Sequence, residues 1–107
     1  MTAPPLADQL AALDVFTRQL PASMRDLVRE RYLMGYEQYG DTWATGRDNL
    51  AEALPEIADA LVYVFQAVMA GQVRLLDIGQ TRNALSDTWM HYTALQRAAA
   101  KRQEATR

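Results

Sequence analysis

Residues 54–70 most constrain the fold of this chain. Leu, Ile, Val, Phe, Ala and Met fill this segment, and between Ala60 and Ala70 the only polar side chains are Tyr63 and Gln66. On a helix these residues surround the axis on nearly every side. A helix that is apolar almost all round is buried on more than one side. The sequence therefore predicts a helix that packs against neighbours on two sides, which favours assembly with a second copy of the chain.

The rest of the chain predicts a small all-α protein. It has 107 residues, half of them apolar, which suits one domain covering residues 1–107. A domain of this size buries only about 60–70% of the surface of its unfolded chain, so oligomerisation would help to stabilise it. We expect a four-helix arrangement, completed by association into a dimer or tetramer. Short disordered tails are expected at residues 1–5 and 102–107.

Helical periodicity and turn residues set the expected element boundaries. Ser23 is a candidate N-cap, with Asp26 placed as in a capping box, and Asp48 or Asn49 can cap the third helix. Pro55 means that the third helix either begins there or is kinked there. The predicted helices cover residues 6–20, 23–39, 49–70 and 81–101, with a polar loop at 41–47 and a short helical turn within 74–78.

Glycines mark two of the expected helix ends and one expected contact. Tyr39-Gly40-Asp41 closes the second helix, with Gly40 as the C′ residue, and Gly71 ends the third. Gly35 carries no side chain, so we expect that another helix can approach closely there.

Two carboxylates lie side by side at the start of the apolar helix. Glu56 and Asp59 are three residues apart, so they are neighbours on a helix surface. At ~100° per residue, Glu52, Glu56, Asp59 and Tyr63 fall within about 60° of one another. Because this stripe continues into an apolar segment, we expect the acids at the mouth of a buried groove, where they would hold a metal ion. The alternative is a solvated face whose acids favour the helix dipole.

The same region resembles the MazG-like, all-α nucleoside triphosphate pyrophosphatases, and most of all the short versions that phages carry. The resemblance covers roughly residues 24–70. The features that carry it are Gly35, Tyr39-Gly40, the loop residues Gly46-Arg47-Asp48, and Glu56-x-x-Asp59 followed by Leu61-Val62-Tyr63.

The resemblance implies an activity and a set of site residues. The expected reaction is Mg²⁺-dependent hydrolysis of a nucleoside or deoxynucleoside triphosphate to the monophosphate and pyrophosphate, with Mn²⁺ as a substitute ion. Glu56, Asp59 and Glu52 are the expected catalytic and metal-binding residues. Three further residues are candidate contacts to the nucleotide: Arg47 to phosphate, Trp43 to the base, and Tyr63 to the sugar or a ligand carboxylate. The alternatives are that Arg47 caps the loop, that Trp43 packs onto the core and that Tyr63 is a packing residue.

The helix that precedes this stretch departs from the family pattern. In the family it carries a motif of the type Glu-Glu-x-x-Glu, which supplies further metal ligands, whereas residues 26–37 contain no Glu-x-x-Glu. Asp26, Glu30 and Glu37 lie within about 40° of each other on a helix. We expect one or both of Glu30 and Glu37 to complete the metal shell. The alternative is an incomplete site in which these are ordinary surface acids. The alternative reading is a non-catalytic helical protein with this fold, phage-encoded, that binds a nucleotide or a host protein.

Composition excludes several other classes of function. The formal net charge is −2, which argues against a nucleic-acid binder that depends on a basic surface. The chain has no cysteine, so it has neither a disulfide framework nor a thiolate metal site. It has no run of 18 apolar residues and no basic-then-apolar N-terminal signal, so neither membrane insertion nor secretion is expected. We expect a cytoplasmic protein, in the host cytoplasm if it is phage-encoded.

Overall fold

The computed structural model describes residues 3–106, and this part of the chain is all-helical. It divides into two compact units, residues 1–47 and 48–107, which we describe one at a time. The described part contains no strand, as the sequence predicted. The single-domain arrangement and the four-helix bundle remain predictions. The elements are α1 (Leu6–Phe16), α2 (Ala22–Tyr39), α3 (Thr42–Thr45), α4 (Asn49–Met69), the 3₁₀ turn η1 (Leu75–Asp77) and α5 (Gly79–Ala105).

The first unit begins with a helical hairpin, α1 and α2. Helix α1 ends at Phe16, earlier than the predicted residue 20. The chain leaves the helix at Thr17, which is buried and whose hydroxyl donates a hydrogen bond of 2.8 Å to the carbonyl of Leu13. Pro21 follows, and the residue before a proline avoids the helical region, so residues 17–20 form a turn instead.

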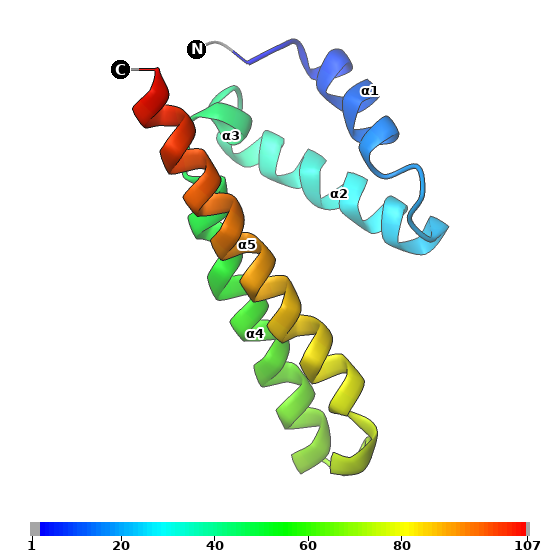
Figure 1. Cartoon of the computed structure of the whole chain (residues 1–107). Coiled ribbons are helices and arrows are strands. Elements are labelled where there is room, and N and C mark those ends of the chain that lie inside the picture. The colour runs from blue at the N-terminus through cyan, green and yellow to red at the C-terminus, as the bar shows by residue number, and fades with distance from the viewer. Residues whose placement is uncertain (1–2, 107) are drawn as a thin grey trace. The chain divides into compact units, whose positions relative to one another are not determined.

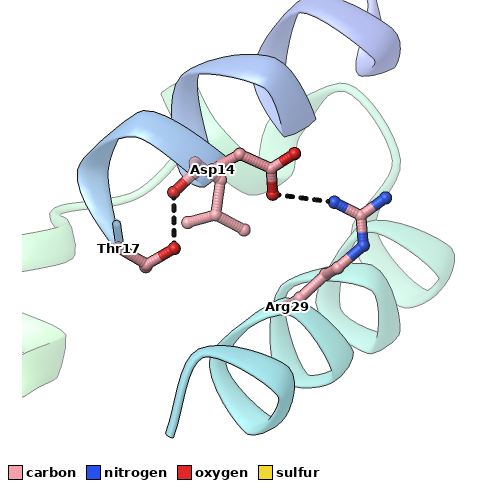
Figure 2. A network of polar contacts seen from close by, with 4 residues as sticks. Asp14, Thr17 and Arg29 are labelled. Atoms are coloured by element: carbon pink, nitrogen blue, oxygen red, sulfur yellow. Dashed lines mark hydrogen bonds and ion pairs between the residues drawn. The ribbon is translucent and has the colours of Figure 1, made fainter. Parts of the chain in front are cut away.

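Polar contacts join α1 to α2. The guanidinium of Arg29 donates to the carboxylate of Asp14 at 3.0 Å (Figure 2). The hydroxyl of Tyr32 donates to the side-chain carbonyl of Gln9. Burial raises the pKa of Tyr32 above its ordinary value, and the neighbouring Tyr36 raises this pKa further. The Tyr32 hydroxyl therefore stays protonated, and able to donate, well above neutral pH.

The ends of α2 confirm one prediction and correct another. Gly40 follows the helix with φ 62°, a conformation that favours glycine, as expected of a helix stop. Ser23 does not cap the helix, so the predicted capping box with Asp26 is wrong. Helix α2 already begins at Ala22, with Pro21 as the residue before it. The carbonyl of Pro21 accepts from the Arg25 amide, which places Ser23 inside the first turn.

Gly35 and Trp43 join α2 to the segment that follows it. Residues 41–47 were predicted as a loop, but they contain the single helical turn α3, which carries Trp43. The indole ring lies directly against Gly35, which is buried. A methyl group placed on Gly35 would come within 2.2 Å of the Cζ2 atom of Trp43. The prediction that the missing side chain at Gly35 allows a close approach is thus correct in kind, although an aromatic ring, not a helix, makes the approach.

We expect Gly35→Ala to displace the Trp43 ring. The overlap should cost about 1–3 kcal/mol, offset in part by about 1 kcal/mol of improved helix propensity. Urea unfolding and tryptophan emission, both measured in a Trp89→Phe background, would report the stability and the new exposure of Trp43. Gly79→Ala is the matched control, because an added methyl there meets no atom within 4 Å. An unchanged Trp43 emission in Gly35→Ala would contradict the packing described.

The second unit is a hairpin of two long helices, α4 and α5, which lie side by side in opposite directions (Figure 1). Helix α4 begins at Asn49 and continues through Pro55, so the alternative in which it starts at the proline is wrong. Asp48 caps it by accepting the Ala51 amide at 3.1 Å. Because proline has no N–H, the carbonyl of Ala51 lacks its usual partner within the helix.

The connection and the second helix of the hairpin follow the prediction in outline. Helix α4 ends at Met69, and Gly71 then adopts φ 74°. The short helical turn predicted within residues 74–78 is the 3₁₀ turn η1. Helix α5 runs to Ala105, so residues 102–105 are helical where a disordered tail was expected. Residues 3–5 precede the first helix without regular structure. Residues 1, 2 and 107, at the outer ends of the two predicted tails, lie outside the described residues.

The apolar series of α5 is only partly covered. Leu85, Trp89, Tyr92 and Leu95 follow one another at helical spacing, but Trp89 and Leu95 are exposed. The less exposed positions within residues 85–99 lie on one side of the helix at ~100° per residue. They are Leu85, Thr88, Tyr92, Thr93, Gln96 and Ala99.

No helix in the described part of the chain is both long and apolar enough to cross a membrane.

Candidate functional site

Helix α4 has three distinct sides. One side is covered by α5 and contains Ile57, which at 8% exposure is the most buried apolar residue described. A second side carries Val62, Phe65 and Met69, of which Phe65 is 61% and Met69 67% exposed. The third carries the carboxylates. Within the described part of the second unit, the apolar circumference predicted from the sequence is therefore covered on one side.

The carboxylates share a single exposed stripe. Because α4 is helical from Asn49 onward, Glu52 belongs to the same stripe as Glu56 and Asp59, and all three are exposed. Glu52 also lies in the first turn of the helix, where a negative charge interacts favourably with the helix dipole. The structure thus brings the three predicted carboxylates to one face of one helix.

Tyr63 lies one turn beyond Asp59 on this stripe and is 71% exposed. We predicted that the stripe would lead into a packed surface, but within the described part of the second unit it is exposed. The less exposed residues of α4 lie on a different side of the helix, the side of Ile57. The hydroxyl of Tyr63 is therefore accessible next to the carboxylates.

The second group of predicted metal ligands lies in the other unit. Glu30 and Glu37 are on α2 and are exposed, as is Asp26. Among the residues that the structure describes, no group of three or more Asp, Glu, His or Cys side chains could hold a metal ion. The metal assignments for Glu52, Glu56, Asp59, Glu30 and Glu37 therefore stay predictions. Mg²⁺ needs no complete protein cage, since one or two carboxylates, water and substrate phosphates commonly suffice.

The two residues predicted to contact phosphate and base form part of an aromatic cluster. The rings of Tyr39 and Trp43 are stacked, 5.5 Å apart between centroids and 6° from parallel. Tyr32 meets Trp43 edge-on at 6.1 Å. The Cζ atom of Arg47 lies 4.8 Å from the centroid of Tyr39 and 5.2 Å from that of Trp43.

This cluster limits what Trp43 can do. The indole is stacked on Tyr39, its six-membered ring lies against Gly35, and its Nε1 atom is buried without a hydrogen-bond partner. A base could stack on Trp43 only after Tyr39 moved away. Tyr39 was expected to help close α2, and its contact with Arg47 was not predicted. Helical spacing could not have indicated this contact, because Gly40 ends α2 between the two residues.

Comparison with known proteins does not identify a family for this chain. No family model, no curated protein and no solved structure matches this chain. The likeness to the MazG-like pyrophosphatases therefore depends on the motif residues in this sequence alone, and it remains a prediction.

Proposed function

We propose that this protein is a MazG-like, Mg²⁺-dependent nucleoside triphosphate pyrophosphohydrolase. The observation that carries the proposal is the exposed stripe of Glu52, Glu56 and Asp59 on one face of α4. The motif resemblance supplies the substrate class and the reaction. In this proposal Glu56 and Asp59 bind the ion, and Glu52, Glu30 and Glu37 supply further carboxylate oxygens.

The stripe has the chemistry that such a site requires. Mg²⁺ prefers oxygen ligands, keeps several waters and is usually shared with substrate phosphates, so exposed carboxylates on a rigid helix suit it. When bound, the ion neutralises the phosphate charge and stabilises the departing pyrophosphate. Tyr63, exposed one turn beyond Asp59, is placed to donate a hydrogen bond to a sugar hydroxyl or a ligand carboxylate.

The exposed apolar side of α4 supports the assembly that we predicted. Val62, Phe65 and Met69 form this side, and we name them the open face. Among the described residues of this hairpin, Ile57 is the one buried apolar side chain, and so small a core contributes little stability by itself. We propose that the open face packs against the same face of a second copy, which completes a four-helix bundle from two hairpins.

One observation favours a second candidate function. The described residues contain no group of three side chains able to hold a metal, and α2 lacks the Glu-x-x-Glu of the family. A cytoplasmic, non-catalytic protein with the same fold, phage-encoded, would bind a nucleotide or a host protein and would not hydrolyse the nucleotide.

Calorimetric titration with Mg²⁺ distinguishes the two functions. For the enzyme, we expect a non-hydrolysable nucleoside triphosphate to tighten Mg²⁺ binding by about tenfold or more, because the phosphates complete the coordination. The wild-type protein should also release pyrophosphate from a common ribo- or deoxyribonucleoside triphosphate. Nucleotide binding that is independent of Mg²⁺, with no pyrophosphate released under Mg²⁺ or Mn²⁺, would favour the non-catalytic protein.

A further inference from the structure

The cluster of Tyr39, Trp43 and Arg47 lies within the first unit, and its three members come from α2, α3 and the residues just after α3. Trp43 is the fixed member. Its ring lies against Gly35, meets Tyr32 edge-on and stacks on Tyr39. Tyr39 is the outer member, 43% exposed. The cluster therefore presents an aromatic surface that is anchored on α2 and accessible at Tyr39.

Arg47 lies against this surface in a defined way. Its Cζ atom is within about 5 Å of both ring centroids, the distance at which an aromatic face attracts a guanidinium. An arginine side chain loses about 2 kcal/mol of rotamer entropy when it is fixed. Here the two rings favour one arrangement before any ligand arrives, so less entropy is lost when the guanidinium makes further bonds.

Contact with a ring also favours one way of using an arginine. When a guanidinium lies on a ring through its flat face, its five N–H donors point outward in the plane of the group. This fork of donors matches two oxygens of a phosphate, which Arg binds in a bidentate manner.

We propose that Tyr39 and Trp43 are positioning residues that hold Arg47 for the polyphosphate of the nucleotide. The inference rests on the proposed function for the identity of the ligand. It also assigns Trp43 a role different from base stacking. The indole supports Tyr39 and Arg47 from within the cluster, while Arg47 makes the contact with phosphate.

The test is calorimetric titration of the whole protein with inorganic tripolyphosphate in the absence of metal. We expect Arg47→Gln to weaken binding by at least about tenfold, because charge-assisted bonds are lost. Tyr39→Leu should weaken binding about threefold to tenfold, which corresponds to the loss of an exposed cation–π contact. Tyr39→Phe should bind like the wild type, since the ring is kept. Arg25→Gln, on the exposed surface of α2, is the control for loss of one positive charge.

Kinetic constants separate positioning from a purely structural effect. In an active enzyme, Tyr39→Leu should raise KM more than it lowers kcat, and Tyr39→Phe should restore the wild-type KM. The inference is overturned if Arg47→Gln and Tyr39→Leu bind tripolyphosphate as the wild type does, or if Tyr39→Phe is as weak as Tyr39→Leu.

The failure of this inference can be told apart from the failure of the proposed function. If the protein releases pyrophosphate and substitutions of Arg47 and Tyr39 do not change the rate, the proposed function holds and the inference about the cluster is wrong. If tripolyphosphate binding depends on the cluster but the protein neither binds Mg²⁺ nor hydrolyses nucleotides, the inference holds and the proposed enzymatic function is wrong.

Discussion

Glu56→Gln is expected to reduce pyrophosphate release by at least about 100-fold, the size of effect seen when one group that stabilises transition-state charge is removed. Glutamine keeps the size of the side chain and suits a helix, so the fold should not change. It lacks the negative charge that makes an oxygen a good ligand for Mg²⁺. The measurement is the rate of pyrophosphate release under saturating Mg²⁺, with circular dichroism as the check on folding.

The control for this variant is Glu104→Gln. Glu104 is an exposed acid near the end of α5, and its replacement removes the same charge away from the stripe. Retention of wild-type activity in Glu56→Gln would show that the metal assignment on α4 is wrong. If Glu56→Gln loses activity as expected, the variants Glu30→Gln and Glu37→Gln are measured next. The one that also loses activity identifies the acid of α2 that takes part.

Phe65→Asp is expected to separate the protein into single chains. In a symmetric dimer the same residue lies at the interface twice, and burying one phenylalanine side chain stabilises by about 1.5–3 kcal/mol. Losing both contacts should therefore raise the dissociation constant at least about 100-fold. Sedimentation velocity at micromolar concentration measures this change directly.

Phe65→Leu is the matched variant, because it keeps an apolar side chain at the centre of the open face. We expect it to sediment as the wild type does. A wild-type protein that sediments as a monomer at micromolar concentration would contradict the assembly, and the open face would then need a different partner. If the Phe65→Asp variant stays dimeric, the interface lies elsewhere on the chain.

The local signals in the sequence predicted the helices well. Gly40, Asp48 and Gly71 mark helix ends where the structure has them, because capping and positive φ are properties of single residues and their neighbours. The errors also have local causes. Ser23 lost the capping role because Pro21, two residues earlier, holds the N-cap position of α2. Helix α1 ends at Phe16 because the chain has to leave the helical region before Pro21.

The sequence by itself determined that the chain is helical, that α4 is apolar nearly all round, and that Glu56 and Asp59 share one stripe. These properties depend only on the 3.6-residue period, which is the same for every helix. The structure adds Glu52 to the stripe, because α4 begins at Asn49 and continues through Pro55. The tertiary structure decided which side of α4 is covered, which leaves Phe65 exposed, and that Trp43 lies against Gly35 with Tyr39 and Arg47 beside it. Such contacts depend on how elements pack in space, and residue spacing along one helix does not specify which neighbour will fill each side.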